Sequence, residues 1–74
     1  MNDFEVIKKA LSTKVKNKEI KETSTFNELG LDSLDLLELV LEVEKDLGVH
    51  FEDEQLIGFK SIEDVLNTVK ELRK

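Results

Sequence analysis

One serine stands out among the residues of this chain that could take part in chemistry. Ser33 follows the loop residues 30–32, which include Gly30, and precedes a strongly apolar and acidic segment. A helix that begins here would present the serine hydroxyl at its N-terminus, where the helix dipole favours an incoming phosphate. This pattern indicates a covalent attachment point rather than a catalytic nucleophile.

Two residues compete for the N-cap position of this helix. If Asp32 is the cap, its carboxylate accepts a backbone N–H, Asp35 takes the capping-box position, and the Ser33 hydroxyl stays unoccupied. If Ser33 is the cap, its oxygen is partly engaged, and the serine is ordinarily no more than a helix start. The residues alone leave both arrangements open.

The apolar spacing is helical almost throughout, and no stretch alternates long enough for a convincing strand. Substantial helices are expected after Asn2, from about Ser33, and after Ser61, with a short helix over residues 53–57 before the last one. We predict an all-α fold, a small four-helix bundle of three main helices plus a short third helix. It forms a single domain over residues 1–74.

Local signals indicate where these elements begin and end. The first helix is expected to fray near residues 14–17, and a single turn opens at Thr25 and closes at Gly30. The central helix ends at Leu47, where Gly48 provides a left-handed stop. The last helix has an apolar stripe, expected to be buried, of Ile62, Val65, Leu66, Val69 and Leu72.

The central helix has two apolar faces at about 100° per residue. A full core stripe consists of Leu36, Leu39, Val40, Val43 and Leu47. A second row, the leucine stripe, consists of Leu34, Leu37 and Leu41, with Glu38, Glu44 and Lys45 around it. The leucine stripe either packs against residues 17–31 or the short third helix, or it is an exposed strip for a basic partner protein. Because it begins beside Ser33, a partner docked there would also face the serine.

The net charge of −6 is unevenly distributed along the chain. Residues 1–21 hold six lysines against three acidic residues, whereas residues 22–59 hold eleven acidic residues against Lys45 alone. Residues 60–74 carry a net charge of +1. An acidic middle segment repels nucleic acid and anionic lipid and attracts basic protein surfaces, so we expect no nucleic-acid binding.

Other kinds of site find little support in the sequence. There is no cysteine for a disulfide or a thiolate metal site, and the longest apolar run is far below the roughly 20 residues that span a bilayer. His50 is the only histidine, and the acidic residues 52–54 lack the spacing of a calcium loop. We therefore expect a cytoplasmic monomer without membrane insertion, metal site or catalytic residues.

The longest informative string resembles a known family. Gly-Leu-Asp-Ser-Leu-Asp at residues 30–35, followed by Leu-Leu-Glu-Leu-Val-Leu-Glu-Val-Glu-Lys-Asp-Leu-Gly, closely resembles the acyl carrier proteins. The resemblance covers essentially the whole chain. It includes Phe26 ahead of Leu29-Gly30, the Gly48-Val49 stop, the acidic residues 52–54 and the final helix from Ser61.

The resemblance implies a carrier that catalyses no reaction itself. Ser33 would be modified by a phosphopantetheinyl transferase, which uses coenzyme A and magnesium, and would hold 4'-phosphopantetheine, whose thiol carries acyl groups as thioesters. Asp32 would help to present the serine. A face for acyl-loading and acyl-processing enzymes with basic docking surfaces would consist of Leu34, Leu37, Glu38, Leu41 and Glu44.

The sequence departs from the family after Val49, where a proline commonly precedes the acidic run and Phe51-Glu52 stands instead. Phe51 is expected to fill part of the interior, which puts the space for an acyl chain in question. Our interpretation is a stand-alone acyl carrier in fatty-acid or related acyl-chain biosynthesis. The alternatives are an aminoacyl, peptidyl or specialised polyketide carrier of the same fold, or a small helical adaptor that binds a basic partner helix.

Overall fold

The computed structural model describes residues 2–16 and 18–73, and its regular elements are helices. The four helices are α1 (Asp3–Leu11), α2 (Ser33–Leu47), α3 (Asp53–Ile57) and α4 (Ile62–Leu72). Within the described ranges, β pairing is limited to one isolated bridge between Thr25 and Ser61. The predicted fold, three main helices plus a short third one, is confirmed.

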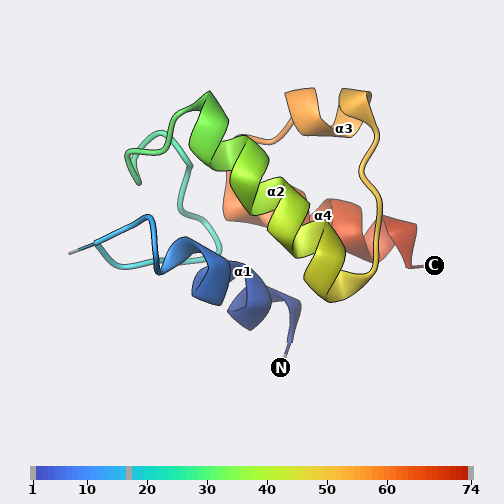
Figure 1. Cartoon of the computed structure of the whole chain (residues 1–74), viewed down its shortest axis with the longest axis horizontal. Coiled ribbons are helices and arrows are strands. Elements are labelled where there is room, and N and C mark those ends of the chain that lie inside the picture. The colour runs from blue at the N-terminus through green and yellow to red at the C-terminus, as the bar shows by residue number, and fades with distance from the viewer. Residues whose placement is uncertain (1, 17, 74) are drawn as a thin grey trace.

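The core forms where α1, α2 and α4 meet. In Figure 1, α2 runs diagonally across the molecule with α4 behind it. Helix α1 lies beside the lower half of α2, and α3 stands apart at the top. The largest fully buried side chains come from the three long helices and are Ile7, Leu11, Leu39, Val43, Ile62, Val65 and Val69. Helix α3 contributes no buried residue and contacts the core through the partly buried Leu56.

Side-chain caps at the helix starts, and a glycine at the end of α2, explain where these helices begin and end. The Asn2 carboxamide oxygen accepts the Glu5 N–H at 2.8 Å, and α4 begins with a reciprocal capping box between Ser61 and Asp64. Gly48 ends α2 with a positive φ of 67°, which costs little only for glycine. Helix α1 ends at Leu11, before the predicted fraying at 14–17; of that segment, Asn17 lies outside the described residues.

The connection between α1 and α2 is packed onto α4 and so places the start of α2. The Phe26 N–H donates to the Lys60 carbonyl at 2.9 Å, and the Ile62 N–H donates to the Ser24 carbonyl at 3.1 Å. Phe26 itself is buried. The predicted turn is also present, because Gly30 has a φ of 78° where the turn closes. Two backbone ties and a buried ring therefore hold the chain just before Ser33.

In the C-terminal half, the expected burial is found for Phe51 but not for Leu72. Phe51 is buried as expected, and its ring packs edge-on against Phe59 with centroids 5.2 Å apart. Leu72 is 37 % exposed rather than buried, because it is the last residue of α4 and the buried stripe ends one turn earlier, at Val69. The aromatic pair thus joins the segment just before α3 to the segment just after it.

Candidate functional site

Asp32, not Ser33, caps the N-terminus of α2. The Asp32 carboxylate accepts the Asp35 N–H at 2.9 Å, and the Asp35 carboxylate accepts the Asp32 N–H at 3.4 Å. Ser33 is therefore the first residue inside the helix, and its side chain is exposed. Among residues 2–16 and 18–73, no group hydrogen-bonds the Ser33 hydroxyl. Of the two arrangements that the sequence left open, the structure has the one with an unoccupied serine.

An open apolar pocket of about 220 Å³ lies beside this serine. Its lining comes from two helices, with Ser33, Leu36 and Leu37 from α2 and Leu56 and Ile57 from α3. A slender group attached to the serine oxygen would find apolar walls here and an opening to solvent. The pocket depends on the placement of α3, the helix with no buried residue.

Ile57 is the residue at this site that the sequence reasoning missed. Its side chain is 82 % exposed, more than any other large hydrophobic residue in the described part of the chain. A signal was available, because Leu56 and Ile57 are adjacent and neighbouring positions on a helix point in different directions. Leu56 packs against the core, and Ile57, about 100° further round the helix, faces solvent.

The leucine stripe is exposed along its whole length. Leu34, Leu37 and Leu41 are 64 %, 49 % and 57 % exposed. The alternative in which residues 17–31 or the third helix cover them is therefore wrong; α3 stands only close enough for Leu37 to share the pocket. Three large apolar side chains in water beside an unoccupied serine make a surface suited to protein docking.

The two glutamates expected to flank the stripe have different surroundings. Glu38 is 53 % exposed on the side of α2 that faces the end of α1, and Lys14 donates a hydrogen bond to its carboxylate. Glu44 is only 18 % exposed, and its carboxylate accepts the Phe51 N–H at 2.7 Å and lies 3.3 Å from the exposed His50. Glu38 thus stays on the exposed surface of α2, whereas Glu44 holds the connection between α2 and α3.

Lys14 is a cation that contacts α2 at Glu38. Its ammonium group bonds Glu38 and lies 4.0 Å from Asp35, and its side chain is 20 % exposed. The hydrogen bond that Lys14 donates to Glu38 raises the pKa of Lys14 above its usual 10.5; desolvation opposes this rise, and the charges of Glu38, Asp35 and Glu42 add to it. The group is therefore fully charged at neutral pH.

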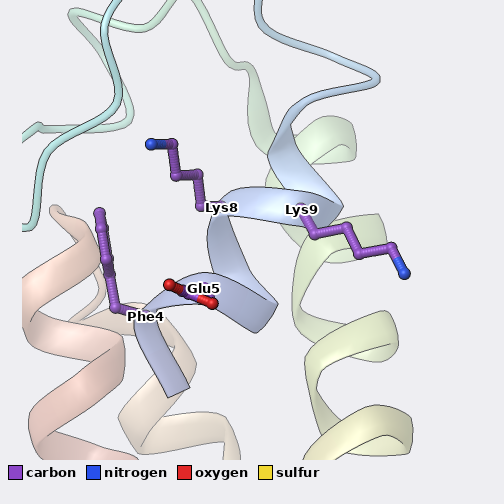
Figure 2. A pocket seen from close by; sticks show the side chains of 4 residues that line it. All are labelled: Phe4, Glu5, Lys8 and Lys9. Carbon is purple, nitrogen blue, oxygen red and sulfur yellow. The ribbon is translucent and has the colours of Figure 1, made fainter. Parts of the chain in front are cut away.

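A larger depression of about 360 Å³ lies on α1, away from Ser33. Figure 2 shows its four lining side chains, Phe4, Glu5, Lys8 and Lys9, all from one helix. The two lysine side chains point in different directions, and the phenylalanine ring stands to one side of them. With no polar groups converging on a common point, this depression is not built to hold a ligand.

Metal sites and membrane spans find no support in the part of the chain that the structure describes. Over the described ranges 2–16 and 18–73, no three histidine, aspartate or glutamate side chains are grouped so as to hold a metal ion. No helix within those ranges has both the length and the apolar character needed to cross a bilayer. Ser33 and its surroundings remain the best-defined site.

Comparison with known sequences places the chain in a family. Residues 5–69 match the family model described as a phosphopantetheine attachment site. The chain is 39 % identical over 64 residues to an acyl carrier protein homolog of Mycoplasmopsis pulmonis (strain UAB CTIP), which covers 86 % of each chain. It is 38 % identical over 71 residues to the acyl carrier protein of Clostridium perfringens (strain SM101), covering 92 % of this chain and 93 % of that one.

A solved structure agrees with the sequence matches. The crystal structure of an acyl carrier protein from Thermotoga maritima superposes with a TM-score of 0.77 at 26 % identity, and covers 93 % of this chain and 82 % of that one. The chain therefore belongs to the acyl carrier protein family, whose members carry acyl groups on covalently attached phosphopantetheine and are carriers rather than catalysts.

Proposed function

We propose that Ser33 is the attachment residue for 4'-phosphopantetheine and that this carrier serves fatty-acid or related acyl-chain biosynthesis. One observation supports the assignment above others: Asp32 takes the cap of α2 and leaves the Ser33 hydroxyl exposed and without a partner among the described residues. Asp32 is then the residue that presents the serine, because its capping bond holds Ser33 in the first turn.

The attachment is a phosphoryl-type substitution at the coenzyme A pyrophosphate. The Ser33 oxygen attacks the phosphorus that bears the pantetheine arm, a new O–P bond forms, and the bond between the two phosphates breaks. The nucleotide leaves with the second phosphate, and the hydroxyl proton passes to a base of the phosphopantetheinyl transferase. The N-terminus of α2 favours the negative charge left on the resulting phosphodiester. Once bound, the group supplies the thiol that this cysteine-free chain lacks.

The surroundings of Ser33 fit such a group. The hydroxyl opens to solvent, and the adjacent pocket has apolar walls from α2 and from α3. Leu37 and Ile57 lie on either side of that pocket and stay exposed. Ser33 alone would hold the group covalently, and these side chains would line the space next to it.

We assign the docking of partner enzymes to the leucine stripe together with Glu38 and Ile57. The three leucines and Ile57 offer apolar area next to Ser33, and Glu38 offers a carboxylate to a basic surface. Glu44 belongs to this face by position, but its carboxylate is engaged with Phe51 N–H. Phosphopantetheinyl transferase and the acyl-loading and acyl-processing enzymes would then share one face, one at a time.

We further propose a monomer that acts in the cytoplasm. A net charge of −6 on a chain of 74 residues opposes association between copies, and the cysteine-free composition is typical of a reducing compartment. Size-exclusion chromatography with light scattering tests the oligomeric state, and a stable dimer would contradict it.

Intact mass tests the attachment directly. The protein is incubated with a broad-specificity phosphopantetheinyl transferase, coenzyme A and magnesium, and one phosphopantetheine increment is expected. Ser33→Ala should show none, whereas Ser12→Ala, at another exposed serine, should show the full increment. An increment that survives Ser33→Ala, or no increment in the wild type, would contradict the assignment. The second result would favour the helical adaptor, which also uses the leucine stripe.

A panel of loading enzymes then distinguishes the cargo. The modified protein is offered to acyl-loading, aminoacyl-loading and polyketide-loading enzymes, and the mass of the product is read. Preferred loading by the acyl-transferring enzymes is expected. Preferred loading with an amino acid would overturn the pathway while leaving the attachment at Ser33 intact.

A further inference from the structure

The end of α1 places a cation against the acidic side of the docking face. Lys14 lies in the turn that follows Leu11, and its N–H donates to the Leu11 carbonyl at 2.8 Å. The next residue, Val15, is buried. The backbone is thus anchored on both sides of Lys14, and the side chain extends to α2, where it bonds Glu38 and approaches Asp35 to 4.0 Å.

This contact changes what a partner meets at Glu38. Lys14 already occupies one oxygen of the Glu38 carboxylate, an exposed acidic group of the proposed docking face. A lysine or arginine of a docking enzyme must therefore share this carboxylate with Lys14 or displace it. Since Lys14 is charged at neutral pH, it holds this carboxylate in an ion pair until a partner's cation replaces it.

We infer that Lys14 is an internal competitor that weakens the docking of basic enzymes at Glu38, and this inference rests on the proposed function. The competition is local and reversible, because the Glu38 carboxylate is 53 % exposed and can exchange one cation for another. A carrier that visits several enzymes in turn has to leave each of them, and related complexes differ mostly in how fast they dissociate. Lys14 acts on Glu38, not on the substrate, and so is a specificity-determining residue rather than a catalytic one.

A purely structural role for Lys14 is the competing explanation. In that case the bond between Lys14 and Glu38 only fastens the end of α1 to α2, and its loss would lower stability and leave docking unchanged or weaker. The competitor role predicts the opposite effect on docking. The two explanations therefore differ in the sign of the change in transfer rate.

Steady-state kinetics of a phosphopantetheinyl transferase with a basic docking surface measures that sign. Lys14→Met removes the charge and keeps an unbranched chain of similar length, and Lys16→Met makes the same change of net charge at an exposed residue two positions along. At low salt, kcat/KM for the carrier should rise roughly two- to fivefold more in Lys14→Met than in Lys16→Met. Lys14→Arg, which keeps the cation, should behave like the wild type.

The Glu38→Gln background shows whether the effect passes through the carboxylate. In Glu38→Gln there is no carboxylate at position 38 for Lys14 to withhold from a partner. The rates of Lys14→Met and Lys16→Met should therefore be equal in this background. The excess of the Lys14→Met rate over the Lys16→Met rate should also shrink as salt is raised well above physiological strength. Salt screens the ion pairs that the exposed Glu38 carboxylate makes with Lys14 and with a partner's cation. Melting curves of each variant confirm that the compared proteins are folded.

Each remaining outcome counts against the inference. Equal rates for Lys14→Met and Lys16→Met, a slower Lys14→Met, or an excess that persists in Glu38→Gln would overturn it. All these results require that the transferase modifies the wild type at Ser33. If it does not, the proposed function itself has failed, so the two failures are distinguishable.

Discussion

The two apolar faces of α2 are alike in composition and opposite in environment. On one face Leu39 and Val43 are fully buried, and on the other Leu34 and Leu41 are 64 % and 57 % exposed. Both faces belong to one continuous helix of 15 residues. The difference arises from what covers them, because the first face joins a core cluster with buried residues of α1 and α4, whereas the short α3 approaches the second.

This contrast separates, within a single helix, side chains that stabilise the fold from side chains that we propose contact partner enzymes. Burial of a leucine contributes about 2 kcal/mol by removing its surface from water, and an exposed leucine contributes almost nothing of this kind. Exposed leucines in a small acidic protein are a cost to solubility that a docking role explains. Substitutions on the two faces should therefore move different measurements.

The largest effect is expected at the buried face. Leu39→Ala should lower the free energy of unfolding by about 3 kcal/mol, because it removes buried methyl groups and leaves a cavity. For a domain of this size, that corresponds to a fall in the melting temperature of roughly 15 °C. Thermal unfolding followed by circular dichroism measures it. A loss as small as that of an exposed leucine would mean that the two faces do not differ in packing.

The exposed face should give the reverse pattern. Leu37→Ala removes a half-exposed side chain, so the free energy of unfolding should change by less than about 1 kcal/mol. If Leu37 anchors partner enzymes beside Ser33, kcat/KM for phosphopantetheine transfer should fall about tenfold. Enzyme kinetics and a melting curve on the same sample check both halves. A destabilisation close to that of Leu39→Ala would instead make Leu37 a core residue.

The helices and their ends could be predicted from the sequence because local interactions determine them. Periodicity indicated α2 and its two faces, and Gly48 and the capping residues indicated the limits. Asp32 and Ser33 were equivalent as caps in the sequence, since either side chain can accept the same N–H. Only the conformation of the chain before α2 decides between them, and that depends on its ties to α4.

Contacts between residues far apart in the chain could not be predicted from the sequence. The pair of Lys14 and Glu38 joins residues 24 positions apart, and no local pattern indicates which lysine turns towards α2. Glu44 looked like Glu38 on the helix, yet one bonds a backbone N–H of the following connection and the other bonds a side chain from α1. Charge and helical position were predicted correctly, but the partners of each carboxylate were not.

The two glutamates extend the comparison to polar residues. Glu44→Ala should lower the free energy of unfolding by about 1–2 kcal/mol, because the Phe51 N–H loses a charged acceptor in a partly buried place. Glu38→Ala, at an exposed carboxylate, should change it by less than about 1 kcal/mol and should instead slow transfer at low salt. Chemical denaturation and transfer kinetics give the two numbers. Equal stability losses would show that Glu44 is not an anchor of the connection.

The smallest effect concerns Lys14 and the dependence of the protein's stability on pH. The pKa of Lys14 is raised in the folded protein, chiefly by its hydrogen bond with Glu38, from an ordinary value of 10.5. A cation with a raised folded-state pKa stabilises the fold fully below its ordinary value, and this contribution is lost as pH rises through the folded value. The difference in melting temperature between wild type and Lys14→Met should therefore be constant from neutral pH to about pH 9.5 and then shrink. A difference that widens in alkali would have the wrong sign for an ammonium group held by a carboxylate.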